Sequence, residues 1–383
     1  MIEEGNVDMT DTSQPERTKL FHLLKAAWPL PVDEFFPLTY PFSPTDHVFT
    51  DARVVVREDE PSSIIAFTLD SQNYREQLAN SRQSRSDAPL TELRHADGSH
   101  YLYEFDTETI KLWCKIFFAE QFDALRHMCG CAEQFVQSLS RCFKWDSRGG
   151  KSGSAFLKTR DDRFVVKQLS RTELDGFSKF APQYFTYLAE CQSALRPTAL
   201  TKIFGYFRIG FKNTHTGRSF KMDFMVMENL LYGRSVDRIF DLKGSTRHRF
   251  VQESGQPHEV LQDENLMQRA QSSPLLVREH SKRILRTALH NDSLFLTEMN
   301  VMDYSLIMAL DTSRNKMVIG IIDYLRTYTW DKRVESFVKE TAILGGGGKG
   351  EPTIITPRQY RMRFLTFLDR NILMTPDPWI QSG

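Results

Sequence analysis

The sequence has no excess of charge of either sign and no long apolar run. Its 49 Lys and Arg residues balance its 49 Asp and Glu residues over 383 positions, so an anionic partner has to meet a local basic patch rather than an overall field. No apolar run approaches the roughly 18 residues of a membrane span, and the acidic N-terminus does not resemble a signal peptide. These absences predict a soluble protein that binds no nucleic acid and has no transmembrane segment.

Cysteine is also scarce, and its spacing excludes a zinc finger. Of the five cysteines, Cys129 and Cys131 form the closest pair, and one short pair does not supply a tetrahedral site. An odd number of cysteines favours a reducing, cytosolic compartment. The 28 Phe residues, by contrast, indicate a substantial hydrophobic core, so the length suits two domains or one bilobal unit with a disordered flank.

The first hundred residues are expected to lie outside the compact part. We expect residues 1–45 to be disordered or extended, because residues 1–20 are polar and five prolines follow between Trp28 and Pro44. Residues 46–98 are expected to form a flank that ends in a linker, since positions 72–98 are strongly polar. The compact part is predicted to begin near Ser99.

Beyond Ser99, the apolar spacing predicts strands at 101–105 and 110–118 and helices around 119–128 and 132–142. Ser273 and Pro274 suit the N-cap and first residue of a long core helix that leads towards Asp303. Thr356 and Pro357 are expected to open another helix. Its apolar side is predicted to carry Tyr360, Phe364, Leu368 and Ile372.

Two aspartates, Asp303 and Asp323, each follow an apolar stretch. A carboxylate at the end of a buried strand is unfavourable unless a cation or a proton transfer requires it there. The pair therefore suggests a phosphotransferase in which one carboxylate orients a hydroxyl and the other holds magnesium. Two capping or turn aspartates are the alternative, and the upstream motifs have to decide between the two.

A glycine-rich loop precedes a strand lysine upstream of these aspartates. The pattern from Arg148 to Leu169 predicts a hairpin whose first strand follows the loop and whose second strand carries Lys167. Glycines allow backbone N–H groups to approach phosphates closely, and a strand lysine adds a point charge. The motif is not a Walker P-loop, because its lysine does not open a helix. By itself, such a loop is more often a flexible turn.

Three further segments suit an anionic substrate and a nucleotide. The apolar run from Met225 ends at Glu228 and Asn229, as a linker over an adenine site does, although an ordinary buried strand end has the same pattern. The short stretch from Lys243 to Arg249 carries two further cationic side chains, which predicts a local anion site rather than a generic solvated loop. The glycines from Gly345 surround Lys349, which predicts a mobile loop. Its place after Asp323 favours a substrate-binding loop rather than a plain surface loop.

In this order, these motifs resemble the phosphatidylinositol phosphate kinases. The resemblance rests on the Gly-Lys-Ser-Gly-Ser run at 150–154, Asp-Leu-Lys-Gly-Ser at 241–245, Met-Asp-Tyr-Ser-Leu at 302–306 and Ile-Ile-Asp at 321–323. Longer stretches at 54–67, 196–200, 226–230, 323–332 and 345–349 are similar to the PIKfyve type (type III), the 1-phosphatidylinositol-3-phosphate 5-kinases, in their C-terminal kinase region. The resemblance covers roughly residues 46–380.

The resemblance implies an α/β (α+β) two-lobed kinase fold with ATP in the cleft. An antiparallel N-lobe would span 99–229, and a mixed C-lobe would span 230–383 with a specificity loop at about 331–356. It also implies ATP and Mg²⁺ as cofactors, a phosphoinositide headgroup as substrate, a regulatory scaffold protein as partner, and a cytosolic location peripheral to endosomal or vacuolar membranes. The product would be the 3,5-bisphosphate. No FYVE-type zinc finger or chaperonin-like domain is present in this sequence.

The same resemblance implies the role of each site residue. The nucleotide would be held by the loop and the strand lysine, with the linker beside the adenine: Gly150, Ser152, Gly153, Ser154, Lys167, Glu228 and Asn229. Asp303 would align the inositol hydroxyl, Asp323 would bind magnesium, and Lys243 would lie close to the reacting phosphates. Arg247, Arg249 and Lys349 would meet the lipid headgroup or the membrane.

Some points stay open at this level. Met308 stands where a protein kinase has its second magnesium ligand, and either Glu173 or Glu190 could pair with Lys167. The alternatives are a kinase of the same fold with another phosphoinositide or a protein substrate, and a catalytically silent phosphoinositide-binding scaffold. The presence of Lys167, Asp303 and Asp323 argues against the silent scaffold.

Overall fold

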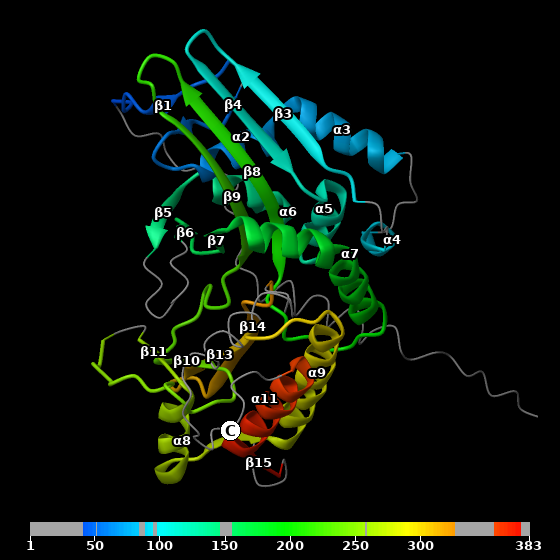
Figure 1. Cartoon of the computed structure of the whole chain (residues 1–383), viewed down its shortest axis with the longest axis vertical. Helices are drawn as coiled ribbons and strands as arrows, with labels where there is room; N and C mark the ends of the chain where they lie inside the picture. The colour runs from blue at the N-terminus through cyan, green and yellow to red at the C-terminus, as the bar shows by residue number, and fades with distance from the viewer. Residues whose placement is uncertain are drawn as a thin grey trace, which may run out of the picture.

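Strand-forming residues of the N-terminal half build one antiparallel sheet of seven strands, in the order β3-β4-β8-β9-β7-β6-β5 (Figure 1). The computed structural model describes residues 41–50, 52–83, 89–94, 98–145, 155–256, 259–325 and 356–376. The strands are β3 (Tyr101–Asp106), β4 (Ile110–Ile116), β5 (Cys142–Trp145), β6 (Phe156–Thr159), β7 (Phe164–Gln168), β8 (Ile203–Asn213) and β9 (Ser219–Glu228). The strands expected near 101 and 110 and the hairpin that carries Lys167 are confirmed.

Six helices of the described chain accompany this sheet. They are α2 (Ser62–Asp70), α3 (Gln72–Gln83), α4 (Pro89–Leu93), α5 (Ala119–Met128), α6 (Ala132–Leu139) and α7 (Arg171–Ser193). A short antiparallel pair, β1 (Asp46–His47) and β2 (Val56–Arg57), precedes them. The helices predicted around 119–128 and 132–142 are confirmed as α5 and α6.

The expectation of a linker over 72–98 is wrong for Gln72–Gln83, which forms α3. Tyr74 and Leu78 lie one helical turn apart and are both buried in the core. The hydroxyl of Tyr103 on β3 also donates to Gln77 at 2.5 Å. Two apolar residues at this spacing are enough to dock the helix, although its composition is polar.

The second lobe contains a smaller mixed sheet with the order β11-β10-β13-β14. Its strands are β10 (Arg238–Leu242), β11 (Val260–Leu261), β13 (Ser305–Asp311) and β14 (Lys316–Ile322). A separate parallel pair consists of β12 (Leu275–Arg278) and β15 (Ile372–Thr375), and the helices are α8 (Asp263–Ser272), α9 (Glu279–Glu298) and α11 (Pro357–Asn371). Together the lobes confirm the expected α/β (α+β) two-lobed fold.

One helix start differs from the expectation. Ser273 and Pro274 do not open a helix, because the residues after them form β12 and α9 begins at Glu279. Pairing of β12 with β15 supplies backbone hydrogen bonds that a local N-cap signal does not reveal. The helix opened by Thr356 and Pro357 is confirmed, with the Thr356 hydroxyl accepting from the N–H of Gln359.

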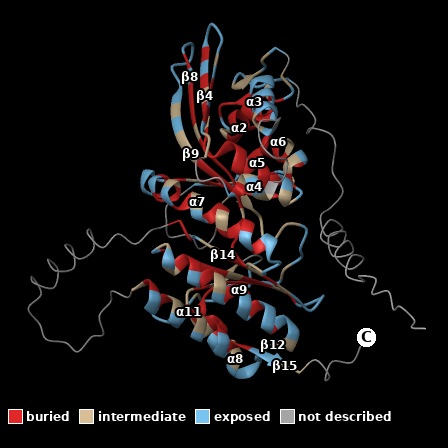
Figure 2. Cartoon of the chain, turned by 90° about the vertical axis from the view of Figure 1, so that its right-hand side faces the viewer, coloured by how far each residue is buried: buried red, intermediate tan, exposed pale blue. Residues whose placement is uncertain are grey.

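The hydrophobic core runs continuously from the large sheet into the second lobe. Figure 2 shows buried residues along α7, which lies between the two sheets, and along α9 of the second lobe. Tyr187 of α7 stacks on Phe295 of α9 with ring centroids 4.2 Å apart, and Phe180 lies beside both Phe295 and Tyr324. Aromatic pairs of this kind add roughly 0.5–1.5 kcal/mol each beyond their buried area. The lobes therefore share one packed interface behind the site.

Candidate active site

Lys167 lies on β7, where it is buried, and its ammonium group has two acidic partners. It donates to Glu173 Oε1 at 3.2 Å and to Asp323 Oδ1 at 3.1 Å. Lys167 and Glu173 are both buried, so this ion pair is shielded from solvent. Asp323 comes from the other lobe, 156 residues further along the chain. Lys167 thus joins the two lobes at the predicted phosphate position.

Glu173 is the helix glutamate that pairs with Lys167. It stands at the third position of α7, where its carboxylate accepts from the N–H of Ser170 at 3.0 Å in a capping box. Burial raises the pKa of this carboxyl, but the Lys167 charge and the Ser170 hydrogen bonds outweigh it and hold the pKa below its usual value. Glu190, the other candidate, lies near the far end of the helix and pairs with Arg196.

Asp303 and Asp323 lie at the same end of one hairpin. The antiparallel register pairs Ser305 of β13 with Ile322 of β14, so the residues just before β13 and just after β14 are neighbours. Both aspartates have the left-handed backbone, with φ of +65° at Asp303 and +59° at Asp323. Such a conformation is uncommon for a non-glycine residue and is concentrated at functional sites. The register therefore places the two turns next to each other.

The Asp323 side chain is suited to a metal ion. It is half-exposed, and among the residues that the structure describes only Lys167 contacts it, at Oδ1. The described residues hold no group of three or more His, Cys, Asp or Glu side chains arranged around a metal position. Mg²⁺ in phosphotransferases commonly uses one or two carboxylates together with substrate phosphates and water. The single carboxylate therefore fits an ion that nucleotide phosphates help to coordinate.

The Asp303 carboxylate is available to a substrate. Its backbone carbonyl accepts a 2.7 Å hydrogen bond from Lys243 Nζ, whereas its carboxylate makes no hydrogen bond or ion pair with any residue that the structure describes. The flanking Met302 and Tyr304 are buried and anchor the turn. The residue that holds this turn, Lys243, comes from the end of β10. The structure thus brings Lys243 next to the turn of Asp303, while the predicted catalytic roles of both residues stay predictions.

The basic segment is anchored by a carboxylate that the sequence did not indicate. Asp263 at the start of α8 is fully buried and accepts from the backbone N–H groups of Lys243 and Gly244 at 2.9 and 2.7 Å. Gly244 has φ +73°, and a Cβ atom there would lie 2.6 Å from the backbone of Phe364. Only glycine fits this turn.

Arg249 and Arg247 differ in how available their charges are. The Arg249 guanidinium contacts Asp263 at 2.8 Å and Asp241 at 3.1 Å, so much of its charge is already compensated. Arg247 is exposed and makes no ion pair within the described ranges. Of the two predicted headgroup contacts, Arg247 is therefore the more accessible to an anion. The assignment of Arg249 to a lipid phosphate stays a prediction.

Glu228 and Asn229 use their side chains to hold the segment between the lobes. Glu228 Oε1 accepts from the N–H of Lys202 at 2.6 Å, and the Asn229 amide donates to the carbonyl of Asp162 at 2.7 Å. The backbone N–H groups of Glu228 and Asn229 are also engaged, with the carbonyls of Lys202 and Arg163 at 3.0 Å each. Their predicted role beside adenine is neither supported nor contradicted by these contacts.

The remaining predicted residues, Gly150, Ser152, Gly153, Ser154 and Lys349, lie outside the described residues. The strands on either side of the first loop are described, and Trp145 of β5 pairs with Phe156 of β6. Phe156 in turn pairs with Lys167 across β6 and β7. The glycine-rich loop therefore joins two neighbouring strands beside the one that carries Lys167.

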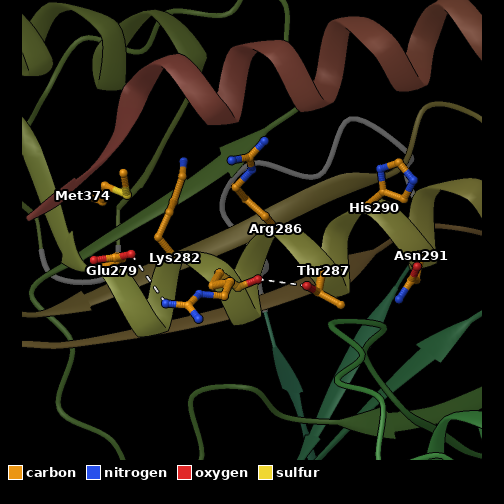
Figure 3. Close-up of a pocket in the computed structure, with 8 residues that line it drawn as sticks. Glu279, Lys282, Arg286, Thr287, His290, Asn291 and Met374 are labelled. Atoms are coloured by element: carbon orange, nitrogen blue, oxygen red, sulfur yellow. Dashed lines mark hydrogen bonds and ion pairs between the residues drawn. The ribbon is translucent and has the colours of Figure 1, made fainter. Parts of the chain in front are cut away.

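A separate hollow of about 500 Å³ lies on α9, between α11 and the end of β15 (Figure 3). Lys282, Arg283, Arg286 and His290 line it, but acidic neighbours compensate much of this charge. Arg283 pairs with Glu279 at 3.5 Å, and Lys282 pairs with Asp369 at 3.0 Å. The hollow shares no lining residue with the Lys167 site.

Comparison with known proteins supplies a family. The family model described as Phosphatidylinositol-4-phosphate 5-Kinase matches residues 138–317 and 310–371. The chain is 40% identical to the 1-phosphatidylinositol 3-phosphate 5-kinase FAB1 of Saccharomyces cerevisiae, over 97% of this chain and 20% of that protein. It is 44% identical to the Homo sapiens 1-phosphatidylinositol 3-phosphate 5-kinase over 79% of this chain, and 40% identical to Arabidopsis thaliana FAB1B over 86%. These alignments cover 14% of the human and 21% of the plant protein, so the chain spans about a fifth or less of each relative.

Proposed function

Because this chain belongs to the phosphatidylinositol-4-phosphate 5-kinase family, we propose that it is an ATP-dependent lipid kinase. It transfers the terminal phosphoryl group of ATP to the 5-hydroxyl of phosphatidylinositol 3-phosphate, which gives the 3,5-bisphosphate. The contact between Lys167 and Asp323 carries the proposal: the candidate phosphate-binding cation and the candidate metal ligand come from different lobes and lie 3.1 Å apart. Asp303 lies at the same end of the hairpin as Asp323.

The 3-phosphate specificity rests on the relatives. The proteins named above are called 3-phosphate 5-kinases, whereas the family model is described by a 4-phosphate substrate. The identity of 40–44% to the former group favours phosphatidylinositol 3-phosphate. Lys349, the predicted headgroup-specificity residue, lies outside the described residues, so substrate choice has to be measured.

In this proposal each residue has one task. Lys167 neutralises phosphate charge, and Glu173 keeps the lysine extended into the cleft. Asp303 accepts a hydrogen bond from the 5-hydroxyl and takes its proton as the new O–P bond forms and the bond to the ADP oxygen breaks. Bound to Asp323, Mg²⁺ would supply charge neutralisation at the transferred phosphoryl group.

The lipid has to reach this site from a membrane surface. In the part of the chain that the structure describes, no helix is both long and apolar enough to cross a bilayer. Arg247 is exposed near the site, and each basic residue near an anionic membrane contributes about 1 kcal/mol. We therefore propose peripheral attachment to endosomal or vacuolar membranes, with a scaffold protein as a further partner that supplies the remaining affinity.

The test is to offer the chain three kinds of vesicle, which carry phosphatidylinositol 3-, 4- or 5-phosphate, with radiolabelled ATP and Mg²⁺. We expect the 3-phosphate to be the preferred substrate, and headgroup analysis should place the new phosphate on the 5-position. An Asp303→Asn chain serves as the control for contaminating kinases. A dominant product from the 4-phosphate would overturn the substrate assignment. Nucleotide binding without any lipid product would favour the silent scaffold.

A further inference from the structure

A buried carboxylate outside the predicted site, Asp292 on α9, has three hydrogen-bond donors around it. It is fully buried, and Oδ1 accepts from the hydroxyls of Tyr187 at 2.6 Å and Thr198 at 2.8 Å. Oδ2 accepts from the backbone N–H of Ala199 at 2.6 Å. A carboxylate in a core is unfavourable by several kcal/mol unless such donors compensate it.

The residues that Asp292 holds are themselves bonded to the strand before Asp323. Ala199 O accepts from the N–H of Ile321 at 2.6 Å, and the N–H of Thr201 donates to Ile321 O at 3.0 Å. Leu200 and Ile321 thus form a short parallel bridge. Ile321 is two residues before Asp323, so one backbone segment links Asp292 to the candidate metal ligand.

The next residues extend this link on the far side of Asp323. The hydroxyl of Tyr324, directly after Asp323, donates to the carbonyl of Thr201. Segment 198–201 therefore forms hydrogen bonds with the chain both before and after Asp323. A shift of this segment would move the metal ligand without changing any residue of the site.

Asp292 is also connected, through α9 and α7, to the turn of Asp303 and to Glu173. Asp292 lies on α9, the helix whose C-terminal end at Glu298 leads into the turn of Asp303. Tyr187, one of its donors, lies on α7, which carries the Lys167 partner Glu173 at its first turn. Asp292 is thus where the elements that carry Asp303, Asp323 and Glu173 meet.

We propose that Asp292 is a positioning residue that sets the position of Asp323 relative to Asp303, and thereby the affinity of the site for the metal–nucleotide pair. This inference rests on the proposed function, because it takes Asp323 as the metal ligand. Residues that orient a metal ligand typically change metal affinity by about 10- to 100-fold when they are removed.

A purely structural role makes a different prediction. The stacked rings of Tyr187 and Phe295 and the packing of Phe180 on Tyr324 already hold the lobes together by apolar contact. If Asp292 were only another contact of this kind, its replacement would lower the melting temperature and leave metal binding unchanged. If it positions Asp323, metal affinity falls in the protein that remains folded.

The experiment measures Mn²⁺ binding by electron paramagnetic resonance in the presence of a non-hydrolysable ATP analogue, at a temperature where every variant is folded. Asp292→Leu removes all three hydrogen bonds, and we expect a Mn²⁺ dissociation constant roughly 10-fold higher than in the unchanged chain. Asp292→Asn keeps one acceptor oxygen for Ala199, and we expect an intermediate value. This partial rescue would not follow from a loss of packing.

Glu58 offers a matched control. It is a buried carboxylate that accepts from Asn213 and contacts His47, each at 2.9 Å, and Asn213 is at the opposite end of β8 from the site. We expect Glu58→Gln to lower the melting temperature and to leave Mn²⁺ affinity unchanged. Unchanged Mn²⁺ affinity in Asp292→Leu, or an equal loss in Glu58→Gln, would overturn the proposal.

Metal binding separates this inference from the proposed activity. If the unchanged chain phosphorylates no lipid, yet Asp292→Leu and Asp323→Asn both weaken Mn²⁺–nucleotide binding, the positioning role stands and the lipid kinase proposal fails. If Asp323→Asn weakens binding and Asp292→Leu does not, the kinase proposal stands and the positioning role fails.

Discussion

Two ion clusters of this protein contain the same kinds of side chain but are built differently. The Lys167 cluster draws Glu173 and Asp323 from the two lobes, and Asp323 is half-exposed. The Arg249 cluster lies within the second lobe, where Asp263 is fully buried and also binds backbone N–H groups. A half-exposed carboxylate can exchange its partner for a ligand, whereas a buried carboxylate with several donors cannot. The first cluster is thus suited to catalysis and the second to stability.

The largest effect is expected at Asp303, which lies at the same end of the β13–β14 hairpin as Asp323. Asp303→Asn keeps the size of the side chain but removes the proton acceptor, so we expect turnover of lipid to fall by about 10²- to 10⁴-fold. Nucleotide binding, measured by fluorescence titration, should be nearly unchanged, because Lys167 and Asp323 remain. Residual turnover above about a tenth of the unchanged chain would contradict the assigned role.

Asp323→Asn tests whether the Lys167 cluster is catalytic rather than structural. Loss of one charge that stabilises the transferred phosphoryl group should lower kcat by about 100-fold. The buried Lys167–Glu173 pair stays intact, so the free energy of unfolding should change by less than about 1 kcal/mol. A loss of stability without a loss of activity would reverse the comparison between the clusters.

Asp263→Asn tests the opposite expectation in the second lobe. It weakens the anchor of Arg249 and of the backbone at Lys243 and Gly244, and breaking a buried pair costs about 3–5 kcal/mol. Urea unfolding should show this loss. Activity per folded molecule should fall less than in Asp323→Asn. Arg247→Ala is a suitable control, since Arg247 is exposed and its loss should leave stability unchanged.

The smallest effect concerns pH. Because the pKa of Glu173 is lowered in the folded protein, its contribution to stability is present above the ordinary value of 4.5 and is lost as pH falls through the lower folded value. Glu173→Gln should therefore be less stable than the unchanged chain near neutral pH. The difference between their unfolding free energies should shrink in acid. Carboxyl groups titrate within about pH 3–7. A difference in unfolding free energy that stays constant over this range would exclude the linkage.

The sequence predicted elements best where local pattern and packing agree. The hairpin of Lys167 and the capped helix at Thr356 are confirmed, because alternating apolar residues and a capping box act within a few residues. The polar stretch 72–83 and the start at Ser273 were interpreted wrongly. In both cases a distant element supplied the deciding contact: the core beneath Tyr74 and Leu78, and the pairing of β12 with β15.

Two carboxylates that anchor the segments around the site were missed, although each left a signal. Asp292 falls on the buried face of α9, four residues after Ala288 and three after Leu289, where a polar residue needs donors. Asp263 is the first residue of α8, where an acidic side chain is favoured by the helix dipole. Neither position says which groups the carboxylate binds, because those donors come from distant residues: Thr198 and Ala199 for Asp292, and 243–245 for Asp263.

The sequence by itself determined the candidate residues for the chemistry: a strand lysine, two aspartates after apolar stretches and a basic segment, in an order that belongs to one family. Only the tertiary structure decided which of them meet. It selected Glu173 over Glu190 as the partner of Lys167, paired Lys167 with Asp323, and engaged Arg249 with Asp241 and Asp263 while Arg247 stayed exposed. The physical reason is that side-chain type is a local property, whereas the partner of a buried charge depends on how segments distant in the sequence pack together.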